Sequence, residues 1–327
     1  MGWKVLVTRE IPEAGLELLK KRCETVDVNT DKRTWPKSEL IKHLAGYDGV
    51  ICLLTDTIDA EVLHAAHEQG IKVFANMAVG YNNIDVSYAA RLGIVITNTP
   101  GVLTETTAEL TWALIFGVSR HIVAADVYMR HRKFRGWEPM LFLGQDLRGK
   151  TLGIIGAGRI GSAVAMMSKG FNMKVIYTDT RKRPRIERAV RAKKKDLDVV
   201  LQEADIITLH TPLAPETHHL IGERELRIIK PTAILINAAR GPIVDEEALV
   251  HALKEQRLFG AGLDVYEREP EVHPGLLRLK NVVLLPHIGS ASLETRSKMS
   301  IMAAKNVLAV LEGKKPPNPV KVKTTKT

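Results

Sequence analysis

Residues 151–161 read TLGIIGAGRIG, an apolar run that leads into a glycine-rich turn and then a helical pattern, and this stretch decides the fold. In that context Gly156 would allow a tight turn, Gly158 would let the backbone approach an anion, and Gly161 would let the helix pack closely on the strand. The start of the helix would offer free N–H groups to a phosphate. We therefore expect a parallel α/β sheet with a dinucleotide site at this turn.

The next strand, KVIYTD at 174–179, ends on Asp179, and its carboxylate could accept hydrogen bonds from the ribose hydroxyls of an adenosine. A carboxylate at that position also repels a 2′-phosphate, which favours NAD over NADP. Arg181, Lys182 and Arg183 follow at once and could instead hold that phosphate. NAD is the expected cofactor, and NADP stays open.

Short β-branched runs alternate with helical patterns along the whole chain, which is typical of parallel sheets covered by helices. The expected strands are 4–8, 49–53, 72–76 and 94–98, then 151–155, 174–178, 206–210, 233–237, 262–265 and 282–285. The expected helices are 13–22, 38–43, 60–68, a long one over about 106–133 opened by a capping box of Thr106 and Glu109, and 293–311. Six apolar strands after residue 150 fit a doubly wound sheet, so we expect two α/β domains.

Three later strands end abruptly on polar side chains. Arg240 follows one strand, Asp264, Glu267 and Glu269 follow the next, and His287 follows the last. Ligands of open α/β sheets bind beyond the carboxyl ends of the strands, where an arginine can clamp a carboxylate and a histidine can exchange a proton. Each residue alone could be an ordinary surface, turn or capping residue. Together, behind the glycine turn, they indicate hydride transfer to a carbonyl beside a carboxylate.

Four motifs resemble the D-isomer-specific 2-hydroxyacid dehydrogenase family: GAGRIG at 156–161, NAARG at 237–241, GLDV at 262–265 and PHIGSA at 286–291. The resemblance covers essentially the whole chain. With the strand pattern, it implies an α/β fold of two doubly wound parallel-sheet domains. A Rossmann cofactor domain, residues 102–289, would be inserted in a flavodoxin-like substrate domain, residues 1–101 plus 290–327.

The resemblance also implies roles for single residues. Arg240 would bind the substrate carboxylate and carbonyl, His287 would be the acid/base, and Glu269 would be its partner. Glu267 is the competing carboxylate, but the family spacing, five residues after Asp264, favours Glu269. Asp264 would lie near the nicotinamide carboxamide. The cofactor-binding residues implied are Thr104, Gly156, Gly158, Arg159, Ile160, Gly161, Asp179, Thr180, Arg181, His210, Thr211, Pro212, Ala238, Asp264 and Gly289.

Stretches elsewhere resemble the glyoxylate/hydroxypyruvate reductase branch of this family: CLLTD at 52–56, MAVGYNN at 77–83, TPGVLT at 99–104 and GWEPMLFLG at 136–144. In that branch the backbone N–H groups of Val79 and Gly80 would bind the substrate carboxylate, and Leu54 would pack over a small acid. Trp137 would reach the partner subunit's site in a homodimer, or else pack within its own crossover loop. The expected reaction is reduction of glyoxylate or hydroxypyruvate, small 2-keto acids, to the D-2-hydroxy acid.

Two alternatives stay open. Phosphite dehydrogenases share the stretch KFRGW at 133–137, but they carry a lysine at the position of Val79. An NAD-sensing transcriptional corepressor of the same fold would ordinarily show disordered extensions, whereas the only extension here is a short tail after Gly313.

The 47 Lys and Arg outnumber the 37 Asp and Glu, which raises the question of a nucleic acid or an anionic membrane as partner. Residues 181–195 carry a net charge of +8 and residues 314–327 carry +5, more than the +10 of the whole chain. The rest is mildly acidic, so we expect neither partner. The basic segment 181–195 follows Asp179, which links it to the choice between NAD and NADP.

Nothing in the sequence indicates a metal or an export signal. Cys23 and Cys52 form no ligand motif, and the histidines at 64, 67, 218 and 219 have no evident carboxylate or thiol companions. No apolar run reaches the roughly 18 residues of a membrane helix. We expect a cytoplasmic protein without a metal.

Overall fold

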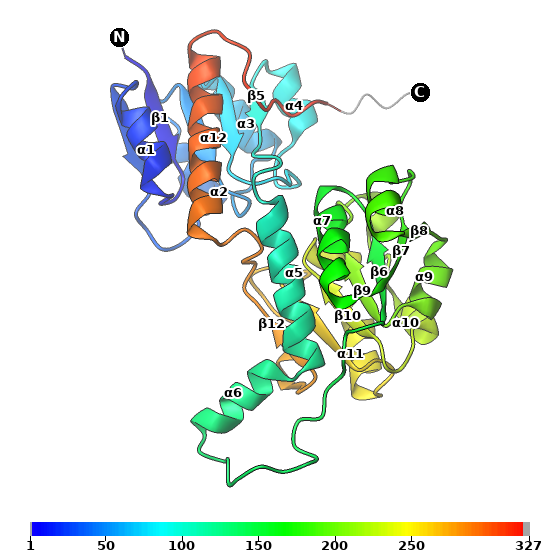
Figure 1. Cartoon of the computed structure of the whole chain (residues 1–327). Helices are drawn as coiled ribbons and strands as arrows, with labels where there is room; N and C mark the ends of the chain where they lie inside the picture. The colour runs from blue at the N-terminus through cyan, green and yellow to red at the C-terminus, as the bar shows by residue number, and fades with distance from the viewer. Residues whose placement is uncertain (1, 323–327) are drawn as a thin grey trace. The chain divides into compact units, whose positions relative to one another are not determined.

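The computed structural model describes residues 2–322 and divides the chain into two compact units (Figure 1). Unit 1 comprises the described residues up to Leu103 and those from Ser290 onward, and unit 2 is Thr104–Gly289. Each unit contains one sheet whose strands are all parallel. The expected fold class is confirmed: two parallel-sheet α/β units, of which the second has the Rossmann arrangement.

The sheet of unit 1 has the strand order β2-β1-β3-β4-β5, which is the flavodoxin-like order. Its strands are β1 (Lys4–Val7), β2 (Thr25–Val28), β3 (Gly49–Cys52), β4 (Val73–Asn76) and β5 (Val95–Thr97). Its helices are α1 (Glu13–Lys20), α2 (Lys37–His43), α3 (Ala60–Glu68), α4 (Val86–Arg91) and α12 (Leu293–Leu311).

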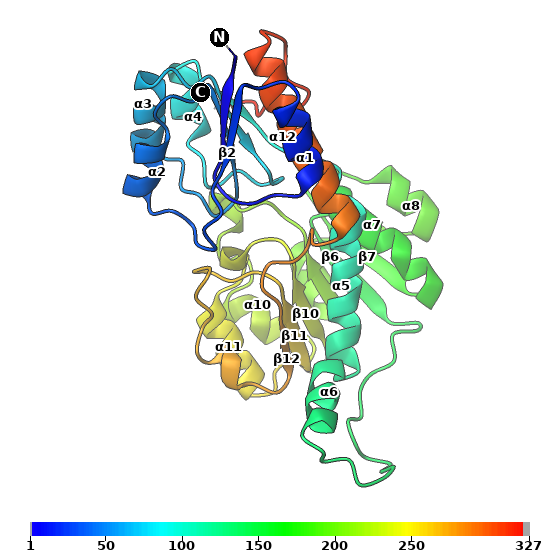
Figure 2. The ribbon, with the colours of Figure 1, turned by 90° about the vertical axis from the view of Figure 1, so that its left-hand side faces the viewer.

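Helices cover both faces of this sheet, and alternate residues of each strand point to opposite faces. Val5 and Val7 pack with α1 and α12, whereas Leu6 packs with α2, α3 and α4 on the other face (Figure 2). Strand β2 was not predicted from the sequence. It is a partly exposed edge strand without a continuous apolar run, so its pattern is weak.

The sheet of unit 2 has the order β12-β11-β10-β9-β6-β7-β8. Its strands are β6 (Thr151–Ile155), β7 (Lys174–Thr178), β8 (Lys193–Lys194), β9 (Ile206–Leu209), β10 (Ile234–Asn237), β11 (Gly260–Leu263) and β12 (Val282–Leu284). Its α-helices are α5 (Thr104–Ser119), α6 (Ile122–Arg130), α7 (Arg159–Met167), α8 (Pro184–Val190), α9 (Leu197–Glu203), α10 (Glu223–Ile228) and α11 (Glu246–Lys254), with 3-10 turns at Ser168–Phe171, Pro215–Thr217, Gly241–Ile243 and Leu276–Arg278.

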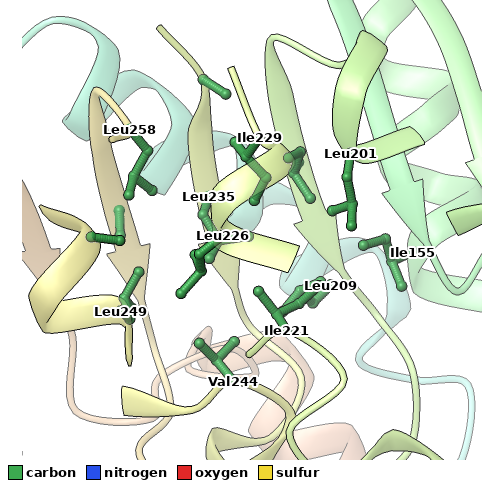
Figure 3. Packing of buried hydrophobic residues seen from close by; sticks show 14 of the residues in the cluster. Ile155, Leu201, Leu209, Ile221, Leu226, Ile229, Leu235, Val244, Leu249 and Leu258 are labelled. Carbon is green, nitrogen blue, oxygen red and sulfur yellow. The ribbon is translucent and has the colours of Figure 1, made fainter. Parts of the chain in front are cut away.

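Two apolar clusters hold this sheet between its helices. The first lies under α9, α10 and α11 and includes Leu209 and Leu235 (Figure 3). The second lies under α5, α7 and α8 and includes Ile154 and Tyr177. The sheet is therefore buried on both sides.

Two expectations for unit 2 are wrong. The sheet has a seventh strand, β8, because two lysines at its edge pair with β7 without any apolar pattern. The expected helix 106–133 is two helices, α5 and α6, which meet at a bend of 64°. The break lies at His121, whose φ of +52° is left-handed, and α5 begins at Thr104, two residues before the expected capping box.

Within residues 2–322 no single helix has both the length and the apolar character needed to cross a membrane; α5 and α6 meet those criteria only when the bent pair is taken together.

Candidate active site

The glycine turn joins β6 to α7, and its three glycines differ in the space that surrounds them. Gly156 has a φ of +89°, and a Cβ there would lie 2.8 Å from the backbone of His210 and Thr211. A Cβ on Gly161 would lie 2.3 Å from the Gly156 carbonyl oxygen. Gly158, at the N-cap of α7, would meet nothing within 4 Å. The turn is therefore packed where the strand and helix meet and open at Gly158, as a phosphate cradle requires.

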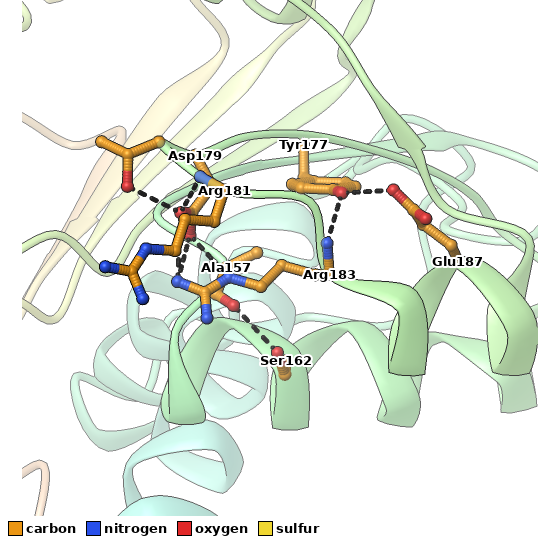
Figure 4. Close-up of polar contacts among 8 residues, drawn as sticks. Ala157, Ser162, Tyr177, Asp179, Arg181, Arg183 and Glu187 are labelled. Carbon is orange, nitrogen blue, oxygen red and sulfur yellow. Dashed lines mark hydrogen bonds and ion pairs between the residues drawn. The ribbon is translucent and has the colours of Figure 1, made fainter.

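At the end of β7 the Asp179 carboxylate faces its neighbours in the chain. It accepts hydrogen bonds from the Arg181 backbone N–H at 3.0 Å and from the Arg183 guanidinium at 3.0–3.1 Å (Figure 4). Burial disfavours the charged form of Asp179, but these donors outweigh it and lower the pKa of the carboxyl. Asp179 is a charged acceptor at the position that the sequence assigned to the adenosine ribose.

At the end of β9, both ring nitrogens of His210 are buried and have no hydrogen-bond partner among residues 2–322. The same is true of the Thr211 hydroxyl. Burial lowers the pKa of His210 to about 3, so the ring is neutral. Buried polar atoms without partners are rare and point to a missing ligand. Together with the open Gly158 cradle, they fit the NAD(P) that the resemblance implies.

The other residues assigned to the cofactor lie on the same unit. Arg159 and Ile160 open α7, and Thr104 opens α5. The Thr180 hydroxyl is 3.4 Å from Asp179, and the Pro212 carbonyl accepts from Thr217 at 2.7 Å. Ala238 follows β10.

The ends of β11 and β12 bring together the expected acid/base pair. His287 Nδ1 lies 2.8 Å from Glu269 Oε2, and the other oxygen of Glu269 accepts from the Tyr266 N–H at 3.1 Å. An ionised carboxylate only accepts, so Nδ1 carries the proton and Nε2 is left for a substrate. Burial disfavours the charge of Glu269, yet the hydrogen bond from His287, that residue's charge and the charge of Arg240 keep its pKa below the ordinary value.

Arg240 follows β10 and is partly buried. Burial lowers its pKa, against the opposing pull of Glu269. One Nη donates to the Ala239 carbonyl at 2.6 Å, and the guanidinium forms no ion pair within residues 2–322. Asn237 fixes this loop by donating to the Arg240 carbonyl at 2.9 Å and accepting from the Ala239 N–H. Arg240 is thus a positioned cation with donors left for an anion.

Asp264 holds the loop that carries the histidine. Its two oxygens accept from the N–H groups of Ile288 and Gly289 at 2.7 and 2.8 Å, and the Gly289 carbonyl accepts from Thr107 at 3.0 Å. Burial raises the pKa of Asp264, which these N–H donors partly offset. His287 itself has a left-handed φ of +55°. The backbone geometry at the histidine is therefore fixed by specific contacts.

The competing carboxylate, Glu267, faces a different histidine, His219. The expectation that His219 lacks a carboxylate companion is wrong, and exposed His64 likewise pairs with Glu68. Among the described residues no group of three or more His, Cys, Asp or Glu side chains could hold a metal ion. No sequence pattern pointed to Glu246, a buried carboxylate that accepts from the Glu267 N–H at 2.8 Å and braces the loop before Glu269.

The expected substrate residues Leu54, Val79 and Gly80 belong to unit 1. Asn98 donates to the Val79 carbonyl at 2.8 Å, and Asn76 donates to the Gly80 carbonyl at 2.9 Å. These contacts fix the peptide planes of the loop after β4. Trp137 lies in unit 2, in the segment after α6, and is 84% exposed, so it does not pack within its own loop.

A glycine turn of this kind, with an arginine and a glutamate–histidine pair beyond the carboxyl ends of the same parallel sheet, defines an oxidoreductase of the dehydrogenase class. Residues 112–289 match the family model described as D-isomer specific 2-hydroxyacid dehydrogenase, NAD binding domain. A glyoxylate reductase of Thermococcus litoralis is 47% identical over 319 residues, which are 96% of this chain and 96% of the relative. The chain belongs to the D-isomer specific 2-hydroxyacid dehydrogenase family.

Solved structures agree. A protein from Thermus thermophilus has a TM-score of 0.91 and 46% identity, covering 97% of this chain and all of that one. An NADPH-dependent glyoxylate/hydroxypyruvate reductase from Sinorhizobium meliloti was solved in complex with NADP and malonate. It has a TM-score of 0.86 and 32% identity, covering 98% of this chain and 97% of that one.

Proposed function

We propose that this protein reduces small 2-keto acids, glyoxylate or hydroxypyruvate, to the corresponding D-2-hydroxy acids with NADH or NADPH. The observation that carries the proposal is the His287–Glu269 pair at the edge of a dinucleotide-binding sheet. It is supported by the near-full-length similarity to a protein named glyoxylate reductase.

In the proposed mechanism, the protonated His287 donates from Nε2 to the carbonyl oxygen of the substrate. Glu269 stabilises the imidazolium through Nδ1 and orients the ring. Arg240 binds the substrate carboxylate and the oxygen on which negative charge develops. The reduced nicotinamide supplies the hydride when it is bound.

We assign the coenzyme to the residues that the glycine turn brings together. The turn from Gly156 to Gly161 would hold the pyrophosphate, with Arg159 and Ile160 at the helix start. Asp179, Thr180 and Arg181 would face the adenosine ribose. The remaining contacts would come from Thr104, His210, Thr211, Pro212, Ala238, Asp264 and Gly289.

For the substrate, we propose that the N–H groups of Val79 and Gly80 bind the carboxylate and that Leu54 covers a small side chain. Leu54 is exposed within its unit, as a residue that contacts a ligand would be. The lysine expected of a phosphite-type enzyme is absent at Val79, and no observation favours a corepressor. The two chain units would be the substrate domain and the cofactor domain.

We propose a homodimer formed through α6 and the segment after it. Helix α6 has no buried residue, and a set of large apolar side chains is exposed over this region: Ile122, Val123, Val127, Met129, Phe134, Trp137, Met140 and Leu143. So many exposed apolar side chains in one segment are typical of an interface. The occupant we propose is a second copy, which would place Trp137 at the partner's site. Light scattering should give a mass of two chains for the wild type. For Val127→Lys it should give the mass of a single chain.

We also propose a cytoplasmic location, because both Cys23 and Cys52 are free thiols, as in a reducing compartment.

The function is tested with purified protein, each reduced coenzyme, and glyoxylate or hydroxypyruvate, by following the absorbance of the reduced nicotinamide. Consumption of at least one coenzyme with at least one acid is expected. No consumption in any of the four combinations would contradict the proposal.

A further inference from the structure

Residues close to the end of the described chain lie along one edge of the unit 1 sheet. Residues 318–320, which we call the C-terminal strap, lie beside β5, the strand at that edge, and pair with it antiparallel (Figure 1). The Val320 N–H donates to the Ile96 carbonyl at 2.8 Å, and the Asn318 carbonyl accepts from the Asn98 N–H at 3.2 Å. Because an edge strand leaves such backbone groups free to pair, the strap covers this edge and reaches the loop after β5.

One buried side chain fastens the strap to that loop. Asn306 of α12 is fully buried, and its Nδ2 donates to the Asn98 carbonyl at 3.2 Å. Its Oδ1 accepts from the Asn318 N–H at 3.0 Å. The backbone of Asn98 is thus held twice, at its N–H by the strap and at its carbonyl by α12. Buried polar networks whose members are satisfied in this way rigidify the segments that they join.

The loop after β5 in turn holds the loop after β4. The Thr99 N–H donates to the Ala78 carbonyl at 2.9 Å, and Asn98 Nδ2 donates to the Val79 carbonyl at 2.8 Å. These carbonyls share their peptide units with the N–H groups of Val79 and Gly80. Because the carbonyl and the N–H of a planar trans peptide point in opposite directions, both N–H groups are turned to the side away from residues 98 and 99.

Three successive carbonyls of the loop after β4 are therefore anchored, since Asn76 of β4 holds the third, that of Gly80, at 2.9 Å. The anchor at Val79 differs from the other two, because a side chain outside β4 supplies it. That side chain belongs to Asn98, whose own backbone is held by the strap and by α12. A single substitution can release this anchor alone.

We propose that Asn98 is a positioning residue for the substrate carboxylate, and that the C-terminal strap and Asn306 act on the substrate through it. The inference rests on the proposed binding of that carboxylate by the N–H groups of Val79 and Gly80. Hydrogen bonds weaken steeply when they are misdirected, and those to a carboxylate are the strong ones. Donors that are aimed before the acid arrives also cost less to order. Releasing the loop should weaken the binding of 2-keto acids and spare the coenzyme, whose proposed contacts lie on unit 2.

The test compares Asn98→Ala with the wild type in the reduction of glyoxylate or hydroxypyruvate, whichever the wild type uses. The substitution removes the amide donor and keeps the backbone groups that pair with the strap. KM should rise about tenfold or more, the scale of a hydrogen bond to a charged group, and kcat should change less. The dissociation constant of the coenzyme should stay within about twofold. Oxamate, a carboxylate of the same shape that is not reduced, should bind the coenzyme-loaded variant more weakly by the same factor.

The matched control is Asn29→Ala. Asn29 is buried in the same unit, and its Nδ2 donates to the Thr8 carbonyl at 3.0 Å just after β2, the strand at the opposite edge of the sheet. It should lose stability as Asn98→Ala does and keep KM within about twofold. Asn98→Leu has a similar shape without the donor, and it repeats the test if a circular dichroism melt shows that Asn98→Ala is unfolded.

The part played by the strap is tested with Asn306→Ala, alone and combined with Asn98→Ala. Alone, it should raise KM by less than Asn98→Ala does. In the double variant KM should be close to that of Asn98→Ala, because groups that act through one another are not additive. Independent effects that multiply in the double variant would contradict an action of Asn306 through Asn98.

An unchanged KM in folded Asn98→Ala would overturn the inference, as would an equal rise in Asn29→Ala or an equal loss of coenzyme affinity. A wild type that reduced neither acid and did not bind oxamate would instead contradict the proposed function on which the inference rests. The two failures are therefore distinguishable.

Discussion

His287 Nδ1 and Glu269 Oε2 lie 2.8 Å apart, although the two residues follow different strands of the sheet. This contact engages Nδ1, so Nε2 is the ring nitrogen that would face the substrate in the proposed mechanism. It also places a charged carboxylate behind the proposed proton donor, because the pKa of Glu269 is held below its ordinary value by His287 and Arg240 against the effect of burial.

A first prediction concerns the pH dependence of reduction. With its lowered pKa, Glu269 stays ionised until the pH falls below its ordinary titration range, so it supports the imidazolium at every working pH. Glu269→Gln removes that support, and the loss of activity at high pH should move about one pH unit toward acid. The control Glu267→Gln, whose carboxylate faces His219, should leave the profile in place. Identical profiles in both variants would count against the assigned partner.

A second prediction separates packing from coenzyme binding in the glycine turn. Gly158 has a φ of −66° and open space around it, so Gly158→Ala should fold normally and lose coenzyme affinity. Gly156→Ala combines a φ of +89° with a Cβ 2.8 Å from backbone, so it should unfold at lower temperature. Thermal melts and coenzyme titrations of the two proteins measure the contrast. Normal affinity in Gly158→Ala would mean that the phosphate does not lie there.

A third prediction uses His210, whose pKa of about 3 lies below its unfolded value because the ring is buried. Between about pH 3 and 6.5 the unfolded chain binds a proton here that the folded chain does not. This residue therefore makes stability fall as the pH decreases from about 6.5, by up to about 1.4 kcal/mol per pH unit. Denaturant unfolding without coenzyme should show a flatter pH dependence in His210→Asn. His64→Asn, at an exposed position, is the control and should keep the wild-type slope.

A fourth prediction concerns Glu246, which braces the loop leading to Glu269. Glu246→Ala leaves the Glu267 N–H without its acceptor and should cost about 1–3 kcal/mol of unfolding free energy. Glu246→Gln keeps an oxygen in place and should retain most of the stability and turnover. Equal losses in the two variants would show that the hydrogen bond is not what matters.

The sequence predicted those parts of the fold and site that short-range patterns determine. Apolar runs located most strands, and the helix α12 has the predicted bounds. Ligands of open α/β sheets bind beyond the carboxyl ends of the strands, and this rule led to Arg240, Glu269 and His287 as candidates. The structure places Glu269 and His287 in direct contact. The family spacing favoured Glu269 over Glu267, and Glu269 is the carboxylate that faces His287.

Patterns of hydrophobicity do not contain the remaining features. Strand β8 consists of two lysines and forms only because β7 offers a free edge. The bend at His121 depends on one left-handed residue between two helical runs. Glu246 and the Asp179–Arg183 pair depend on contacts across loops, and their residue types alone are those of ordinary surface charges.

The most direct test of the proposed mechanism is the turnover of His287→Ala with glyoxylate, measured beside its coenzyme affinity. If His287 is the general acid, turnover should fall about 10²–10⁴-fold, the usual contribution of such a group, while the dissociation constant of the coenzyme stays within about twofold. Unchanged turnover in a folded variant would contradict the account.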